Sequence, residues 1–74
     1  MRTINRIKTA EKIRECRFLA ELGQKELAEI ADMSVSTLQK IEYEGRGVQA
    51  WQQLFRIADA LGVYPEDLMV WEEE

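Results

Sequence analysis

The sequence predicts an all-α protein, a compact domain of four to five helices. Apolar residues recur every three or four positions through nearly every segment, which is the spacing of a helix face rather than of a strand. The chain has one proline, four glycines and few runs of β-branched residues. Its 74 residues allow one small core and no deep cleft between lobes. We expect one domain over residues 9–70, preceded by a basic arm or helix extension (1–8) and followed by an acidic tail (71–74).

The first helix is expected from Ala10 to about Leu22, with Thr9 as a plausible N-terminal cap. Residues 1–8 are basic, and they are either an arm that contacts phosphate or a solvated terminus. Within the helix, apolar positions at helical spacing define the face that packs on the domain. These positions are Ile13, Cys16, Leu19 or Ala20, and Leu22.

Two adjacent large apolar residues, Phe18 and Leu19, lie near the end of this helix. One interpretation is that they pack locally against residues 1–7. The other is that they form a surface for a protein partner, because contiguous exposed apolar patches usually mark contacts.

The stretch from Gln24 to Glu42 predicts two short helices joined by a tight corner. The first helix has an apolar face at helical spacing, beginning with Leu27 and Ala28. Asp32 occupies the corner, where a short polar side chain tolerates positive φ. Ser34 can cap the second helix, which should start near Val35. Helices this short are marginal alone, so they must pack against the rest of the domain.

This stretch resembles the helix-turn-helix of the Cro/CI-type repressor family, also called the Xre family. The matching residues within it are Gln24, Leu27-Ala28, Ser34, Leu38 and Ile41-Glu42. The flanking motifs are Ile13-Arg14-Glu15-x-Arg17 and Ile57-Ala58-Asp59-Ala60-Leu61-Gly62-Val63. The likeness extends from about Lys12 to Met69. It implies a repressor-like fold whose second short helix lies in the DNA major groove.

The resemblance also implies roles for individual side chains. The expected base contacts are Val35, Ser36, Gln39 and Lys40. The expected phosphate contacts are Gln24, Lys25, Ser34 and Arg46. Free amides at the start of the helix after Gly23 favour an anion there. Arg17 and Glu42 are implied to form a structural ion pair.

The C-terminal third predicts the main core helix and a short last helix. The core helix spans Gln49 to Leu61, and Gly62 ends it as a C-terminal glycine. Its apolar stripe consists of Trp51, Leu54, Phe55, Ala58 and Leu61. Pro65 opens the last helix. Beyond it, Trp71 either caps the core or enters a partner or dimer interface.

The charge distribution is uneven, although the net charge is −4. Residues 1–20 hold six of the ten basic side chains, whereas residues 66–74 hold five acids and no base. A phosphate-binding surface in the first part is therefore compatible with an acidic chain. The acidic tail is either simple solvation or a means of repelling non-specific DNA or meeting a basic partner.

Together these features predict a sequence-specific regulator of transcription that binds double-stranded DNA, with repression as the expected mode. One monomer contacts few base pairs, so we expect a homodimer on a two-fold site. The alternative is a protein-interaction module or an antitoxin-like partner, motivated by the acidic balance, Phe18, Leu19 and Trp71. No histidine is present, so we expect neither an enzyme nor a cofactor or metal. The lone Cys16 cannot form a disulfide within the chain. No run of about 18 apolar residues predicts a membrane span, and we expect a cytoplasmic protein.

Overall fold

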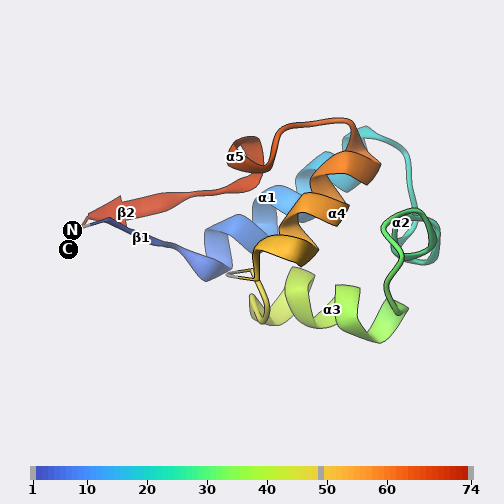
Figure 1. Cartoon of the computed structure of the whole chain (residues 1–74), viewed down its shortest axis with the longest axis horizontal. Coiled ribbons are helices and arrows are strands. Elements are labelled where there is room, and N and C mark those ends of the chain that lie inside the picture. The colour runs from blue at the N-terminus through green and yellow to red at the C-terminus, as the bar shows by residue number, and fades with distance from the viewer. Residues whose placement is uncertain (1, 49, 74) are drawn as a thin grey trace.

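The computed structural model describes residues 2–48 and 50–73, which form five helices around one core and a two-stranded sheet at one end (Figure 1). The elements in order are β1 (Arg2–Ile4), α1 (Arg6–Leu19), α2 (Gln24–Ile30), α3 (Val35–Glu44), α4 (Trp51–Leu61), α5 (Pro65–Leu68) and β2 (Trp71–Glu73). The prediction of an all-α repressor-like domain is confirmed, and the two short strands are an unexpected addition. None of the described helices is both long and apolar enough to cross a membrane.

The first helix begins earlier than predicted. Asn5 has an extended backbone, and its side-chain oxygen accepts a hydrogen bond from the Lys8 amide at 2.9 Å, so Asn5 is the cap and α1 starts at Arg6. The prediction of Thr9 as the cap is therefore wrong. Thr9 is buried within the helix, and its hydroxyl accepts a hydrogen bond from the Val70 amide at 3.0 Å. This bond ties the C-terminal segment to α1.

Strands β1 and β2, from opposite parts of the sequence, form an antiparallel ribbon. Ile4 lies opposite Trp71, and Arg2 lies opposite Glu73. The Asn5 amide donates to the Val70 carbonyl at 2.7 Å, which extends the ladder toward the helices. Strands of three residues carry too few positions for a period-two pattern, so periodicity did not predict them.

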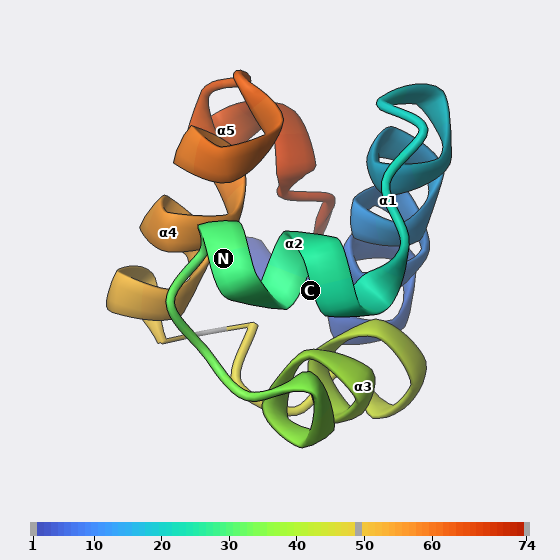
Figure 2. The same cartoon turned by 90° about the vertical axis from the view of Figure 1, so that its right-hand side faces the viewer.

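The core lies where the five helices meet, and Figure 2 shows α2 crossing in front of the others. Its largest fully buried side chains come from all five helices and the loop before α4. They are Ile13, Leu27, Leu38, Ile41, Leu54, Ile57, Leu68 and Val48. The predicted stripe on α4 is partly wrong, because Trp51 and Phe55 are exposed. Phe55 follows Leu54 and is therefore turned about 100° around the helix axis, away from the core.

Two corners of the chain have non-glycine residues with positive φ. Asp32, between α2 and α3, has φ of 57°, so the prediction for this corner is confirmed. Glu21, between α1 and α2, has φ of 58°. Both adopt the left-handed conformation that glycine tolerates best. At the end of α3, Gly45 also has positive φ, and an added Cβ would lie 3.0 Å from the Arg6 carbonyl oxygen.

Candidate nucleic-acid interface

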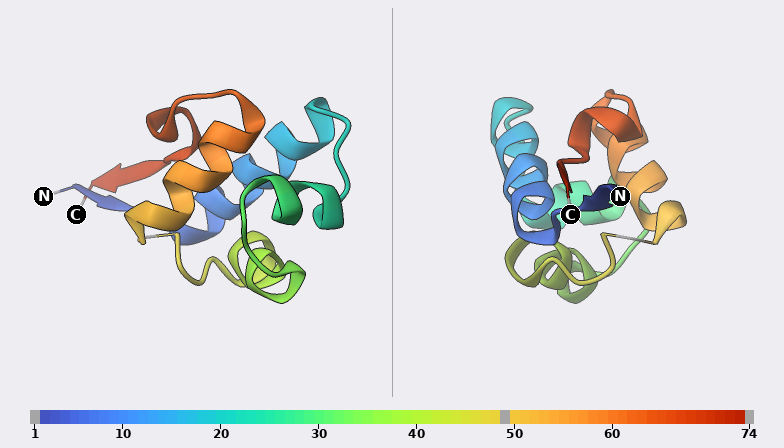
Figure 3. Two further views of the ribbon diagram at one scale, coloured as in Figure 1. Left: turned by 45° about the vertical axis from the view of Figure 1, so that its right-hand side comes forward. Right: turned by 90° about the vertical axis from the view of Figure 1, so that its left-hand side faces the viewer.

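The outer face of α3 is open to solvent along the lower side of the molecule (Figure 3). Ser34 caps the N-terminus of α3: its hydroxyl accepts a hydrogen bond from the Thr37 amide at 3.1 Å and donates one to the Thr37 hydroxyl at 2.8 Å. Leu38 and Ile41 point into the core. The exposed positions of the helix are Ser36, Gln39, Lys40, Tyr43 and Glu44. This face is thus polar and unobstructed within the described chain.

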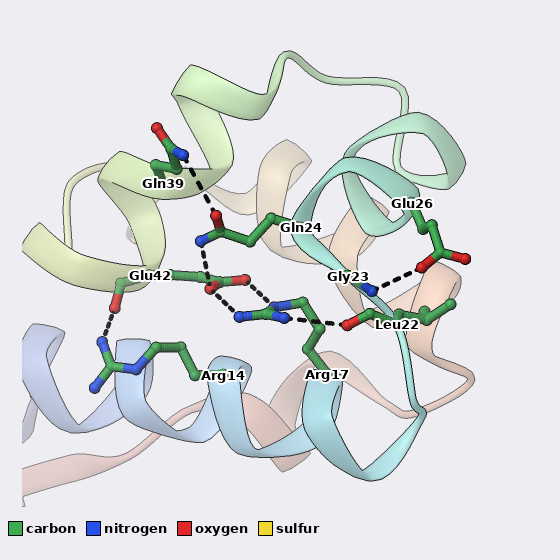
Figure 4. A network of polar contacts seen from close by, with 8 residues as sticks. All are labelled: Arg14, Arg17, Leu22, Gly23, Gln24, Glu26, Gln39 and Glu42. Atoms are coloured by element: carbon green, nitrogen blue, oxygen red, sulfur yellow. Dashed lines mark hydrogen bonds and ion pairs between the residues drawn. The ribbon is translucent and has the colours of Figure 1, made fainter.

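A buried ion pair fixes α3 against α1. Arg17 Nε donates to Glu42 Oε2 at 2.8 Å, and Arg17 Nη2 donates to Glu42 Oε1 at 3.0 Å, so the ion pair is bidentate. Arg17 Nη1 also donates to the Leu22 carbonyl at 3.1 Å (Figure 4). The Glu42 side chain is wholly buried. The structure therefore contains the ion pair that the family resemblance implies.

The network extends from the buried carboxylate to the exposed face (Figure 4). Gln24 Nε2 donates to Glu42 Oε1 at 3.1 Å, and Gln39 Nε2 donates to Gln24 Oε1 at 3.3 Å. These bonds restrict the side chain of Gln39, an expected base contact. They also use both the Nε2 and the Oε1 atoms of Gln24, an expected phosphate contact.

The start of α2 already has an internal anion. Glu26 Oε1 accepts a hydrogen bond from the Gly23 amide at 2.9 Å, so a carboxylate lies at the amides where a phosphate was expected. Lys25 is exposed beside it. Of the two expected phosphate contacts here, Lys25 has the more available side chain.

A shallow hollow of about 430 Å³ lies beside α3. Its lining residues are Ser36, Gln39, Lys40, Tyr43, Glu44 and Arg46. Arg46 lies 3.7 Å from the Glu44 carboxylate, and both side chains are largely exposed. The structure thus brings three expected base contacts and one expected phosphate contact to one surface, together with one carboxylate.

Two other predicted contacts are less available than this group. Val35 is half-buried and packs against the core, because the first turn of α3 lies next to the α2 corner. Ser34 is exposed, but its hydroxyl is used in capping the helix. A role in DNA contact requires either side chain to give up part of its present packing or bonding.

Arg14 and Tyr43, for which the sequence predicted no contact, meet beside α3. Arg14 Nη1 donates to the main-chain carbonyl of Glu42, and its guanidinium lies 5.0 Å from the centre of the Tyr43 ring. The spacing of Arg14 and Arg17, one helical turn apart on α1, is the signal that could have placed both on the α3 side.

Phe18 and Leu19 are at the opposite end of α1 from the ribbon, with exposed fractions of 68% and 77%. The interpretation that they pack against residues 1–7 is wrong for the described residues, because Phe18 and Leu19 are the last residues of α1, whereas Arg6 and Ile7 are its first, and both side chains are exposed. The Arg17 guanidinium lies 4.9 Å from the centre of the Phe18 ring. This leaves an exposed apolar pair beside the buried ion pair.

Cys16 is half-buried against the core. Burial raises the pKa of its thiol above the ordinary value, so the reactive thiolate is the minor form at neutral pH. Within the described residues, no three His, Cys, Asp or Glu side chains converge where they could hold a metal ion.

The short helices α2 and α3 meet at a tight corner. The outer face of α3 is exposed, and its inner face is fixed to α1 by the Arg17–Glu42 ion pair. This arrangement defines a helix-turn-helix domain. Residues 10–71 match the helix-turn-helix domain family, and the chain belongs to this family. A search of curated protein sequences found no match.

Among solved structures, the chain is similar to the restriction-modification controller protein C.AhdI from Aeromonas hydrophila. The TM-score is 0.79 with 27% identity, covering 85% of this chain and 94% of C.AhdI. This similarity confirms the resemblance to the Cro/CI-type fold.

Two HppE structures are similar over part of their length. Cobalt(II) HppE with Tris buffer gives a TM-score of 0.77 and 26% identity, covering 88% of this chain and 36% of HppE. Iron(II) HppE with substrate gives a TM-score of 0.79 and 25% identity, covering 89% and 38%. This chain therefore spans little more than a third of the HppE chain.

Proposed function

We propose that this protein is a sequence-specific regulator of transcription that binds double-stranded DNA as a homodimer, acts as a repressor and has no enzymatic role. The observation that carries the proposal is the exposed face of α3, where Ser36, Gln39 and Lys40 project together while Arg17 and Glu42 hold the helix from behind. A helix presented in this way fits the major groove. The controller protein C.AhdI, similar over most of both chains, supports a regulatory role.

Each side chain has a distinct task in this proposal. Lys40 donates to guanine acceptors, and Ser36 bonds to a base edge or a phosphate. Gln39 pairs with adenine in an orientation limited by its bond to Gln24. Lys25 and Arg46 contact phosphates on either side. Two copies read half-sites about one helical turn apart, because one α3 reaches few base pairs.

The test begins with selection of a binding site from a random duplex library. Binding of the selected duplex is then measured by fluorescence anisotropy at several salt concentrations. Lys40→Ala and Ser36→Ala should each weaken specific binding by about 1–3 kcal/mol and leave the helical circular dichroism unchanged. Lys12→Ala is the matched control, because it removes the same charge from a position that does not line the α3 hollow.

Two results would contradict the proposal. One is failure of the library to yield any preferred sequence. The other is equal weakening by Lys40→Ala and Lys12→Ala, because only net charge would then matter.

The exposed Phe18 and Leu19 favour a second candidate, a protein-interaction or antitoxin-like role. The two functions differ in salt dependence, since affinity for DNA falls steeply as salt rises. A chain that binds no duplex at low salt but retains a protein partner sensitive to Phe18→Glu would have the second function.

A further inference from the structure

Arg14, Arg17 and Arg46 all contact α3, and they differ in what neutralises their charge. Arg17 binds the Glu42 carboxylate, and Arg46 lies 3.7 Å from the Glu44 carboxylate. Arg14 donates instead to the main-chain carbonyl of Glu42, and within the described residues it has no carboxylate partner. Because a carbonyl carries no net charge, the charge of Arg14 beside α3 is not cancelled.

This charge lies next to the exposed face of α3. The Arg14 side chain extends from α1 toward the last turn of α3, beside Arg17 on the same helix (Figure 4). Its guanidinium lies 5.0 Å from the centre of the Tyr43 ring. Tyr43 is 60% exposed and lines the α3 hollow together with Lys40 and Arg46. Arg14 is thus at the edge of the surface that the proposed function assigns to DNA.

The Arg14 side chain is held in place before any ligand binds. Its Nη1 is bonded to the Glu42 carbonyl, and its guanidinium lies over the Tyr43 ring. Glu11, three positions earlier on α1, forms no ion pair with it in the described chain. A guanidinium has five N–H donors in a fork that matches a phosphate, so donors remain after the carbonyl bond. A side chain that is already fixed also loses less rotamer freedom on binding.

We propose that Arg14 binds a phosphate of the DNA backbone and that Tyr43 is the positioning residue that holds the guanidinium for this contact. This inference rests on DNA binding by α3, as in the proposed function, and adds a contact from α1. Phosphate contacts orient a protein on the duplex without reading its sequence. Arg14 should therefore strengthen binding to selected and random duplexes alike, unlike a base contact, which acts mainly on the selected duplex.

The salt dependence of binding separates a phosphate contact from a purely structural role. Loss of one phosphate contact lowers the slope of log K against log salt concentration by about 0.9. Arg14→Gln should lower the slope by about this amount for each bound monomer, and should weaken binding of both duplexes about tenfold at low salt. Lys12→Gln is the matched control, because it removes a charge about 200° around the axis of α1 and should leave the slope unchanged. Fluorescence anisotropy measures both quantities.

Variants of Tyr43 test how the guanidinium is held. Tyr43→Phe keeps the ring and should bind both duplexes as the parent chain does. Tyr43→Leu removes the ring and should weaken binding of both duplexes about three- to tenfold. In the Arg14→Gln background the same change should have no further effect, because the two side chains act as one unit. Weaker binding by Tyr43→Phe would overturn the positioning role, because the hydroxyl would then itself contact DNA.

Duplexes in which single phosphates are replaced by neutral methylphosphonates locate the contact. One such replacement should weaken binding by the parent chain and leave binding by Arg14→Gln unchanged. Circular dichroism identifies a variant that fails to fold. Tyr43→Leu alters an exposed ring and should reduce the effect of the same replacement, so the contact can be tested without Arg14→Gln. If no replacement distinguishes the folded variants from the parent chain, the inference is wrong.

The possible outcomes separate this inference from the proposed function. A parent chain with a preferred site, whose Arg14→Gln variant keeps the salt slope of the Lys12→Gln control, overturns the inference alone. A lower slope for Arg14→Gln on random duplexes, with no preferred sequence for the parent chain, supports the phosphate contact and contradicts sequence-specific binding. A parent chain that binds no duplex at low salt overturns both.

Discussion

Two Arg–Glu pairs that have their glutamates on α3 differ in burial and geometry. Glu42 and Glu44 are two residues apart on α3 and therefore point about 200° apart around its axis. Glu42 is buried and forms a bidentate ion pair with Arg17 through hydrogen bonds of 2.8 and 3.0 Å. Glu44 is exposed and meets Arg46 at 3.7 Å. An Arg–Glu pair thus occurs once on the buried side of α3 and once on its exposed side.

This difference in burial assigns the two pairs different tasks. A buried charge loses its hydration, so it must keep every partner that it has. An exposed pair is screened by water and salt and contributes little to stability. We call Arg17–Glu42 the inner pair and Arg46–Glu44 the outer pair. The inner pair should therefore determine the position of α3. The outer pair should affect the electrostatic potential at the exposed face of α3.

Removing the inner carboxylate should have the largest effect. Glu42→Ala leaves the Arg17 guanidinium buried without its counter-charge, and should lower the free energy of unfolding by about 3–5 kcal/mol. Urea unfolding followed by circular dichroism measures this loss. Glu44→Ala is the matched control and should change stability by less than about 0.5 kcal/mol. Equal stability of the two variants would show that burial does not separate the pairs.

Replacing both inner partners should undo most of that damage. Arg17→Met combined with Glu42→Leu removes both buried charges together, and apolar pairs of similar volume are often neutral or stabilising in such positions. The double variant should regain most of the stability that Glu42→Ala loses. If it stays as unstable as Glu42→Ala, the hydrogen bonds to Leu22 and Gln24 matter more than the charge balance.

The helices, the corner at Asp32 and the inner pair could be predicted from the sequence. An apolar helix face repeats over many positions, so a single atypical residue does not hide the pattern. Arg17 and Glu42 were placed by family resemblance, since no local pattern links residues 25 positions apart. The ribbon was missed because strands of three residues at opposite ends of the chain pair only in the folded state.

For the candidate site, sequence reasoning placed side chains on the correct helix but not their partners. Ser36, Gln39 and Lys40 share the exposed face of α3, as their helical spacing predicts. The bond from Gln24 to Gln39 and the contact of Arg46 with Glu44 depend on rotamers and neighbours that spacing does not specify. Exposure of Trp51 and Phe55 depends on where α4 meets the core, which is also a tertiary property.

Neutralising the outer carboxylate should have a smaller effect, and on binding alone. Glu44→Gln keeps the side-chain shape but frees Arg46 from its counter-charge. Affinity for duplex DNA should rise about two- to tenfold at low salt, with a steeper dependence on salt concentration. Anisotropy titrations at several salt concentrations measure both quantities. Unchanged affinity would mean that Arg46 does not approach the phosphates.

The smallest effect should come from the connection that leads from Arg17 to α2. Glu21 has φ of 58°, where an L side chain is strained and glycine is not. Glu21→Gly should raise the free energy of unfolding by roughly 0.5–1 kcal/mol, because relief of strain outweighs the added freedom of the unfolded chain. Glu21 is exposed, and in the described part of the chain the side chains of Arg17 and Glu42 bond to each other, to Leu22 and to Gln24. The gain should therefore add to the loss in Glu42→Ala. If Glu21→Gly does not raise the free energy of unfolding in the Glu42→Ala background, then the inner pair determines the conformation of the turn between α1 and α2. It would do so through the bond from Arg17 to the Leu22 carbonyl.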